Sequence, residues 1–404
     1  MADWKQLFTQ VAGNVEEHFD TLKSRLQERI GSSDPLKILP YNGYGTAKKL
    51  FLSGRVIEDN GITASSDNDT LWQNLLNIYK RLESDEIPRA RVRVLFQGQE
   101  QEVITDEEGL FEVKLEVTEP LRQNSADVDD YVDFRQAWHD VELQLLEPQC
   151  SHHHEVRATG QVLVPPPSAK FGVISDIDDT VVQTDATDML RMARVVFLNN
   201  ARTRLPFEGV AGFYRALQQG ASGRENNPIF YVSSSPWNLY DLFTEFFEFQ
   251  GIPTGPILLR DLGLSKDILL ATGHESHKLS KIQPILNLYP ELPFILIGDS
   301  GQQDAEIYRQ VVHDYPGRIL AVYIRNVTPE PKRQEAILAL AEEVRSAGSQ
   351  LLLAQDTLAA AMHAVEQGWI SSEALQAVRI EKEVDEREPS LFEQIVVQQS
   401  DFDI

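Results

Sequence analysis

The stretch that most constrains the fold of this chain is an apolar run that ends in three acidic residues. Phe171–Ser175 has the composition of a buried strand, and Asp176, Asp178 and Asp179 follow it directly. Burying carboxylates at a strand end is costly unless a metal ion or hydrogen-bond donors compensate. One such acid would be an ordinary loop or capping residue, but three in this place are unusual. Because open α/β sheets bind ligands outside the carboxyl ends of their strands, the stretch predicts a ligand site there.

The apolar pattern of the second half of the chain predicts an α/β domain. Compact apolar runs alternate with helical stretches, which is typical of a Rossmann-like parallel sheet covered by helices. We place this domain at 168–330, with helical extensions and a polar, mobile tail over 331–404. The runs that we assign to strands are Phe171–Ser175, Ile229–Ser233, Phe294–Ile297 and Ile319–Ile324. The predicted C-terminal helices are Ala336–Val344 and Leu358–Val365, and Glu381–Glu388 is assigned to the mobile tail.

The first half of the chain has a different, β-rich pattern. Short runs that alternate apolar and polar side chains predict an antiparallel β-sandwich over 49–165, with a helical insertion at Thr70–Leu82. The turn at Thr105–Phe111 resembles those of transthyretin-like domains. Before this domain, over 1–48, we expect an amphipathic helix at Met1–Ile30 and a linker. The prolines at 165–167 form a stiff spacer and mark the boundary with the α/β domain.

Charge and cysteine content narrow the classes of function. With 37 Lys and Arg against 62 Asp and Glu, the net charge is −25, which disfavours nucleic acid as a partner. The lone Cys150 permits neither an internal disulfide nor a cysteine zinc site, as expected of a reducing compartment. We find no secretory signal and no bilayer-spanning run. We therefore expect a cytoplasmic protein, with peripheral membrane contact left open and protein partners unknown.

Polar side chains follow other predicted strands at the same edge of the sheet. Ser233–Ser235 offers hydroxyl and N–H groups for phosphate oxygens, and Gly298-Asp299-Ser300, with Asp304 shortly after, offers oxygen ligands. Lys278 opens a helical pattern and is suited to direct a cation into the same pocket. Each feature alone is ordinary, because serines cap helices and lysines are usually solvated. Together they indicate a phosphate and metal site.

Together with the acids after Phe171–Ser175, these features make four motifs that resemble those of the haloacid dehalogenase superfamily. The resemblance holds in order and spacing over about Lys170–Val327. Within it, the sequence is similar to the phosphatidate phosphatases of the actin-patch-protein type. The stretches that carry this narrower resemblance are Tyr231–Tyr240, Leu259–Asp261, His277-Lys278, Gly298–Gly301, Asn200–Arg204 and Ile324–Val327.

The resemblance implies a Mg²⁺-dependent phosphatase with an aspartyl-phosphate intermediate. It makes Asp176 the nucleophile and Asp178 the general acid, whose presence favours phosphatases over dehalogenases and transport ATPases. Ser233 and Lys278 would hold the phosphoryl oxygens, while Ser234 and Arg260 would contact substrate. The implied magnesium ligands are Asp176, Asp178 through its carbonyl oxygen, Asp299 and Asp304.

The substrate is less constrained than the chemistry. The segment Met189–Phe207 contains no acid, and four arginines lie among its apolar residues: Arg191, Arg194, Arg202 and Arg204. It could therefore present phosphatidate at a membrane surface. A core helix with solvated arginines is an equal alternative. Trp237 could likewise be a packing residue or a lipid contact. The rival functions are a phosphatase for a soluble phosphoester or phosphoprotein, and a non-catalytic interaction protein.

Overall fold

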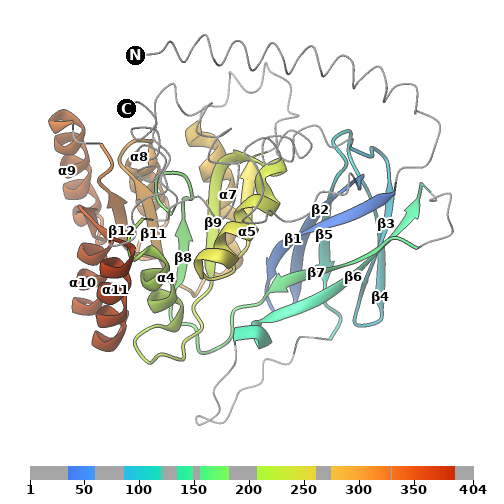
Figure 1. Ribbon diagram of the computed structural model, residues 1–404, viewed down its shortest axis with the longest axis horizontal. Coiled ribbons are helices and arrows are strands. Elements are labelled where there is room, and N and C mark those ends of the chain that lie inside the picture. The colour runs from blue at the N-terminus through green and yellow to red at the C-terminus, as the bar shows by residue number, and fades with distance from the viewer. Residues whose placement is uncertain are drawn as a thin grey trace, which may run out of the picture.

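The computed structural model describes two sheets, one for each half of the chain (Figure 1). The described residues are 35–59, 86–119, 121, 134–148, 155–181, 207–260, 274–328 and 330–386. The predicted helices at Met1–Ile30 and Thr70–Leu82 lie outside these ranges. Among the helices in the described ranges, none is both long and apolar enough to cross a membrane.

The second half of the chain forms a six-stranded parallel sheet, as predicted. In spatial order its strands are β10 (Ile257–Arg260), β9 (Ile229–Pro236), β8 (Gly172–Ser175), β11 (Phe294–Asp299), β12 (Ile319–Arg325) and β13 (Leu351–Ala354). The four predicted strands are β8, β9, β11 and β12. The edge strands β10 and β13 were not predicted, because both are short, with four residues each.

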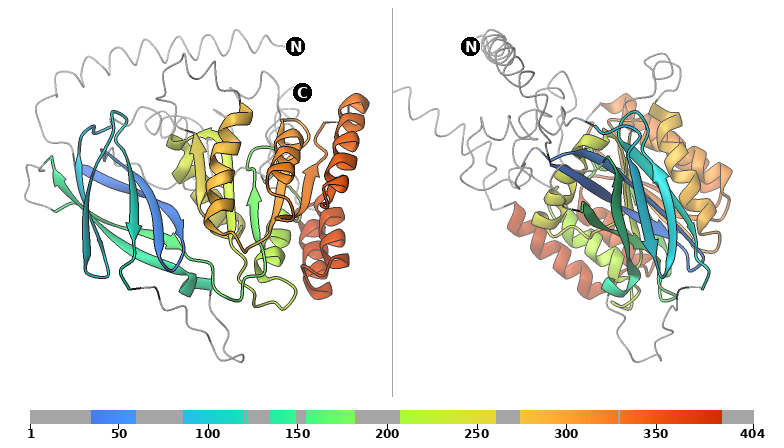
Figure 2. Two further views of the ribbon diagram at one scale, coloured as in Figure 1. Left: turned by 180° about the vertical axis from the view of Figure 1, so that it is seen from behind. Right: turned by 90° about the vertical axis from the view of Figure 1, so that its right-hand side faces the viewer.

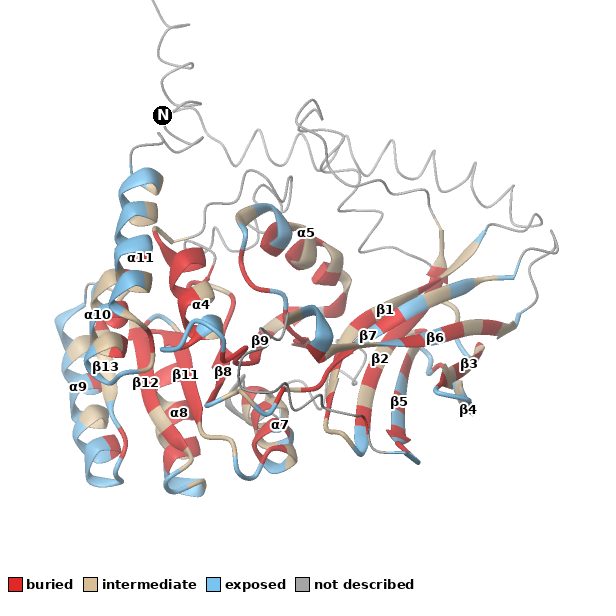
Figure 3. Ribbon diagram, turned by 90° about the horizontal axis from the view of Figure 1, so that it is seen from below, coloured by how far each residue is buried: buried red, intermediate tan, exposed pale blue. Residues whose placement is uncertain are grey.

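Helices cover both faces of this parallel sheet and make a three-layer α/β unit (Figures 2 and 3). One apolar core lies against α4 (Val210–Gln219), α5 (Tyr240–Gln250), α10 (Thr357–Glu366) and α11 (Ser372–Asp385). The other lies against α7 (His274–Leu288), α8 (Asp304–Asp314) and α9 (Pro331–Ser346). Strands buried on both faces explain why β8, β9, β11 and β12 read as continuous apolar runs rather than alternating ones.

The α/β unit continues past residue 330, where we had placed the end of the domain. Strand β13 pairs with β12 in the same sheet, and α11 packs on α4. Val378 of α11 is fully buried in the core, and Glu381 pairs with Arg215 of α4. The expectation of a mobile polar segment at Glu381–Glu388 is therefore wrong up to Asp385, where α11 ends. Some of the polar residues there make contacts: Glu381 pairs with Arg215, and Asp385 accepts a hydrogen bond from the N–H group of Gly209.

The first half of the chain forms one seven-stranded sheet instead of the two stacked sheets of a sandwich. In spatial order its strands are β4 (Gln99–Ile104), β3 (Arg91–Phe96), β6 (Trp138–Glu147), β7 (Arg157–Leu163), β1 (Leu36–Gly45), β2 (Lys49–Glu58) and β5 (Leu110–Glu116). The short helix η1 (Phe134–Ala137) precedes β6. All pairings are antiparallel except that of β1 with β7. The edge strands β4 and β5 contact each other, so the sheet curls around its own core.

Strand β1 explains the difference from the predicted sandwich. It pairs with β2 on one side and β7 on the other, and so joins two groups of strands into one sheet. We had placed 36–45 in a linker, and this stretch contains Pro40, Asn42 and Gly43, which are residues typical of turns. The structure pairs Pro40 with Gly54 of β2 and places Asn42 and Gly43 at a register shift between Tyr41 and Tyr44, where such residues are tolerated inside a strand.

Two positions on α11 test whether this helix belongs to the folded unit. Val378 is fully buried, whereas Ile380, two residues later, is 63% exposed. We expect Val378→Asp to lower the free energy of unfolding by about 3 kcal/mol or more, because it buries an unpaired charge. Ile380→Asp should stay within about 0.5 kcal/mol of the parent. Urea denaturation measures both, and equal effects would show that α11 does not pack as described.

Candidate active site

The candidate site lies where the order of the parallel strands reverses. Strands β8 and β11 are neighbours, but the chain continues from β8 to β9 on one side and from β11 to β12 on the other. Such a switch point leaves a crevice outside the carboxyl ends of the two strands. Asp176 follows β8 and Asp299 ends β11. The acids predicted from the sequence therefore lie at the place where an open α/β sheet binds its ligand.

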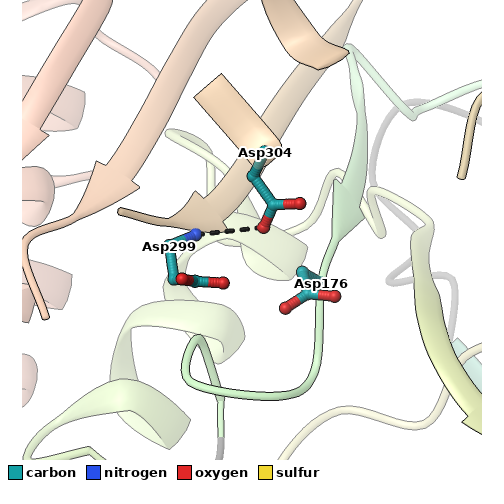
Figure 4. Close-up of side chains that lie close together, drawn as sticks. All are labelled: Asp176, Asp299 and Asp304. Atoms are coloured by element: carbon teal, nitrogen blue, oxygen red, sulfur yellow. Dashed lines mark hydrogen bonds between the residues drawn. The ribbon is translucent and has the colours of Figure 1, made fainter. Parts of the chain in front are cut away.

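Three buried carboxylates come together at this edge (Figure 4). Asp176, Asp299 and Asp304 each offer an oxygen, and these oxygens all lie within 4.8 Å of one another. Asp304 begins α8 and packs closely on the backbone of β11. A Cβ atom at Gly298 would lie 2.5 Å from Asp304 Oδ2, so only glycine leaves room for this carboxylate. Steric hindrance by Asp304 thus explains why glycine precedes Asp299 in the sequence motif.

Lys278 is the cation of the cluster. It lies in the first turns of α7, and its Nζ atom is 2.8 Å from Asp176 Oδ1 and also contacts Asp304 Oδ1. Burial disfavours the charged ammonium, but the two carboxylates outweigh this effect and raise the pKa of Lys278 above its usual value. Lys278 is therefore protonated at neutral pH. It neutralises one of the three acids and leaves the cluster with excess negative charge.

The excess charge and one unpaired oxygen fit a hard divalent cation. Asp299 Oδ1 accepts hydrogen bonds from the N–H groups of Gly301 and Gln302, at 2.6 and 2.8 Å. Its Oδ2 atom is buried and has no hydrogen-bond partner among the described residues. Burial, together with repulsion from Asp304, raises the pKa values of Asp176 and Asp299. An oxygen-only donor set with this charge is suited to Mg²⁺ and not to a soft metal.

Asp304 differs from the other two acids in that both of its oxygens have protein partners. Oδ1 pairs with Lys278, and Oδ2 accepts a hydrogen bond of 3.1 Å from the N–H group of Asp299. The arrangement favours Asp304 as the residue that holds Lys278 and the end of β11 in place. Asp176 and Asp299 are better placed to bind a cation directly.

The side chain of Asp178 points away from the cluster of Asp176, Asp299 and Asp304. Its Oδ2 atom accepts hydrogen bonds from Ser233 Oγ at 2.7 Å and Ser235 Oγ at 3.0 Å. Its backbone oxygen faces the other way, toward Gln302 Nε2 at 3.4 Å. The residue after it, Asp179, adopts a left-handed backbone conformation with φ of 56°. The side chains of Asp176 and Asp178 thus contact different groups although one residue separates the two acids.

Ser233 and Ser234 do not share one role in the structure. Side chains alternate along a strand, so Ser233 and Ser235 point to the same side and Ser234 to the other. The hydroxyl of Ser234 is buried without a hydrogen-bond partner among the described residues. Alternation would have identified Ser235 as the partner of Ser233, but we had selected Ser234 for contact with substrate.

The predicted substrate-binding arginines are only partly described. Arg260 ends β10 in register with Pro236 of β9, at the carboxyl edge of the sheet. The predicted surface residues Arg191, Arg194, Arg202 and Arg204 lie outside the described residues. The structure therefore brings the acids, Ser233 and Lys278 together, places Arg260 at the same edge, and leaves those four arginines as a prediction from the sequence.

One supporting residue could not be found from the sequence. Arg333 of α9 donates hydrogen bonds to the backbone oxygens of Ser300 and Gln302 and pairs with Glu306. It thereby braces the loop whose N–H groups bind Asp299. Arg333 lies beyond the motifs and has no distinguishing neighbours in the sequence, so only the packing of α9 on α8 reveals it.

The geometry can be compared with known proteins over the segment that contains the site. Residues 171–326 match the family model described as "Phosphatidate phosphatase APP1, catalytic domain". A segment of 173 residues is 33% identical to Phosphatidate phosphatase APP1 of Saccharomyces cerevisiae, and covers 42% of this chain and 28% of that protein. An uncharacterized protein of Schizosaccharomyces pombe is 31% identical over 159 residues, which are 39% of this chain and 25% of that protein.

The two sequence matches cover only part of each relative. The matched segments span about a quarter of the length of the two curated relatives. Among solved structures, a carbohydrate acetylesterase from Xanthomonas citri aligns over 78% of this chain and 74% of its own, with 13% identity and a TM-score of 0.24. A TM-score this low supports no argument about fold or function. The sequence matches, in contrast, confirm the resemblance indicated by the motifs: residues 171–326 are similar to the catalytic domain of the phosphatidate phosphatase APP1 family.

Proposed function

We propose that this protein is a Mg²⁺-dependent phosphatase with a haloacid dehalogenase-like catalytic domain, and that it hydrolyses phosphatidate to diacylglycerol. The observation that carries the proposal is the separation of two nearby carboxylates. Asp176 lies with Lys278 in the buried acidic cluster, whereas Asp178 is held by two serines outside it. A phosphatase that forms an aspartyl-phosphate uses one carboxylate as the nucleophile and a separate group as the general acid.

The proposed reaction has two displacements at phosphorus. An oxygen of Asp176 attacks, the bond from phosphorus to the alcohol oxygen breaks, and Asp178 gives that oxygen a proton. Asp178 then takes a proton from water, which attacks phosphorus and breaks its bond to Asp176. Ser233 and Ser235 both donate to Oδ2 of Asp178, and this leaves Oδ1 to carry the transferred proton.

The surrounding charges favour the approach of an anionic substrate to an anionic nucleophile. Lys278 lies against Asp176 and can also attract the phosphoryl oxygens. Asp176 and Asp299, with the backbone oxygen of Asp178, would hold Mg²⁺. When bound, the ion would offset negative charge on the carboxylates and on the phosphoryl group.

The choice of phosphatidate as substrate is supported by the relative from Saccharomyces cerevisiae, whose name states that substrate. Because the matched segment covers 28% of that protein, the substrate is part of our proposal. The basic segment between residues 189 and 207 is consistent with a peripheral contact to an anionic lipid surface.

The role of Asp176 can be tested by one isosteric substitution. We expect Asp176→Asn to lower kcat by at least about a hundredfold, because an amide is a poor nucleophile, while the protein stays folded. Asp314→Asn is the matched control, since Asp314 lies at the end of α8 away from the cluster. Turnover of phosphatidate in mixed micelles measures the effect, and circular dichroism checks the fold. Activity in Asp176→Asn near that of Asp314→Asn would exclude Asp176 as the nucleophile.

Metal binding can be measured without an assay of activity. Mg²⁺ at about a hundred times its Kd should stabilise the folded protein by about 2.7 kcal/mol, visible as a rise in Tm. In Asp299→Asn the rise should disappear, because one ligand is lost. The apo form of that variant should be no less stable than the parent, since a buried repulsion is relieved. An unchanged response to Mg²⁺ in the variant would contradict the assigned site, as would full activity of the parent in excess chelator.

Replacing the arginines between residues 189 and 207 distinguishes a lipid phosphatase from a phosphatase that acts on soluble esters. Each basic residue near an anionic surface is worth about 1 kcal/mol, so replacing Arg191, Arg194, Arg202 and Arg204 by Gln should weaken vesicle binding by about two orders of magnitude or more. Turnover of a soluble phosphomonoester should survive. Sedimentation with phosphatidate-containing vesicles measures the binding. If the soluble ester is lost equally, these arginines support the fold or the pocket instead of the lipid surface.

A further inference from the structure

Strand β1 of the N-terminal sheet contacts the segment that directly follows Ser233 and Ser235. That segment is the short helix η2 (Trp237–Leu239) and the start of α5. The ring of Tyr41 in β1 stacks on Trp237, with centroids 4.5 Å apart and planes 10° apart. It also lies 4.4 Å from the ring of Tyr240. All three aromatic side chains are buried, so Trp237 is a packing residue between the two halves of the chain.

A β-bulge in β1 adds a hydrogen bond to this aromatic contact. The register of β1 against β2 shifts between Tyr41 and Tyr44, which releases Asn42 from the ladder. The free N–H group of Asn42 donates a hydrogen bond of 2.6 Å to the hydroxyl of Tyr240. A Cβ atom at Gly43 would lie 2.1 Å from the backbone oxygen of Phe51, so the bulge requires glycine there. The sheet thus uses an irregular backbone position to bind the α/β unit.

The same short segment also carries the hydrogen-bond partners of Asp178. Ser235 is two residues before Trp237, and its hydroxyl and that of Ser233 both bind Asp178 Oδ2. The N–H group of Ser235 in turn donates to Ser233 Oγ, at 2.9 Å. One end of the segment is therefore fixed to β1 and the other to the candidate general acid. A displacement of Trp237 would move the serines with it.

We propose that β1 positions the general acid: Tyr41 and the pair of Asn42 with Tyr240 hold the segment 233–240 so that Asp178 faces the leaving group. This inference rests on the proposed function, because it assigns Asp178 the transfer of a proton. Tyr41 and Tyr240 are positioning residues and need not touch the substrate. The N-terminal sheet is then part of the catalytic apparatus, since a misplacement of about 1 Å can cost about a hundredfold in rate.

A second contact between the two halves of the chain supplies the matched control. Tyr289, which follows α7 and precedes β11, donates a hydrogen bond of 2.9 Å from its hydroxyl to the backbone oxygen of Gly45. It lies at the amino edge of the parallel sheet, away from Ser233 and Asp178. Tyr240→Phe and Tyr289→Phe thus remove the same group and one buried hydrogen bond to the same strand. Only the first change is expected to affect the general acid.

The test compares two leaving groups in the full-length protein with Mg²⁺. Loss of a general acid slows an alkyl ester, such as phosphatidate in mixed micelles, more than an activated aryl ester such as p-nitrophenyl phosphate. We expect Tyr240→Phe and Tyr41→Leu to lower kcat/KM by about tenfold for the alkyl ester and by about twofold or less for the aryl ester. The value of kcat/KM reports the first displacement and not the later attack of water, which is the same for both esters. Tyr41→Phe, which keeps the ring, should restore the parent ratio, and Tyr289→Phe should not alter it.

Hydrogen exchange gives a second readout that does not depend on catalysis. In Tyr240→Phe and Tyr41→Leu the N–H groups of 233–239 should exchange faster than in the parent, and in Tyr289→Phe they should not. Unchanged exchange, or equal loss on both esters in all variants, would overturn the inference and leave the proposed function standing. If the parent hydrolyses neither ester, the proposed function fails, and exchange alone then decides whether β1 holds the segment.

Discussion

The arrangement of this protein depends on the gathering of three carboxylates around one ammonium group at a strand edge. Asp176, Asp299 and Asp304 are all buried, and Lys278 neutralises only one of them. Such a cluster lowers stability unless a cation or hydrogen-bond donors offset the repulsion. The fold supplies part of that offset through the N–H groups of the loop after β11. The remaining negative charge is what makes the cluster suited to a divalent metal and an anionic substrate.

The chemistry proposed for the site requires that two acids one residue apart behave differently. Ser233 and Ser235 hold the side chain of Asp178 at β9, while Asp176 stays with Lys278. Arg333 braces the loop whose N–H groups bind Asp299. Strand β1 of the other sheet contacts the segment that follows Ser233 and Ser235. With β1 positioning Asp178 as we propose, the site draws on both halves of the chain, although all of its predicted residues come from one.

The sequence predicts the core of the site well because its strands are buried on both faces. Continuous apolar runs identify β8, β9, β11 and β12, and the acids at their ends follow from the rule that ligands bind at the carboxyl edge. Local patterns fail where tertiary contacts decide. Turn-forming residues conceal β1, β13 is too short to stand out, and α11 reads as a polar tail because only a narrow stripe around Val378 is buried. Arg333 acts on backbone oxygens across space, and no sequence pattern records such contacts.

The central claim is that phosphoryl transfer passes through Asp176, and the stereochemistry at phosphorus tests it most directly. A phosphomonoester made chiral at phosphorus with oxygen isotopes or sulfur can be hydrolysed in isotopically labelled water, and the configuration of the released phosphate or thiophosphate then determined. Two successive in-line displacements, first by Asp176 and then by water, predict net retention of configuration. Net inversion would mean that water attacks the substrate in a single step, and would contradict the covalent role of Asp176.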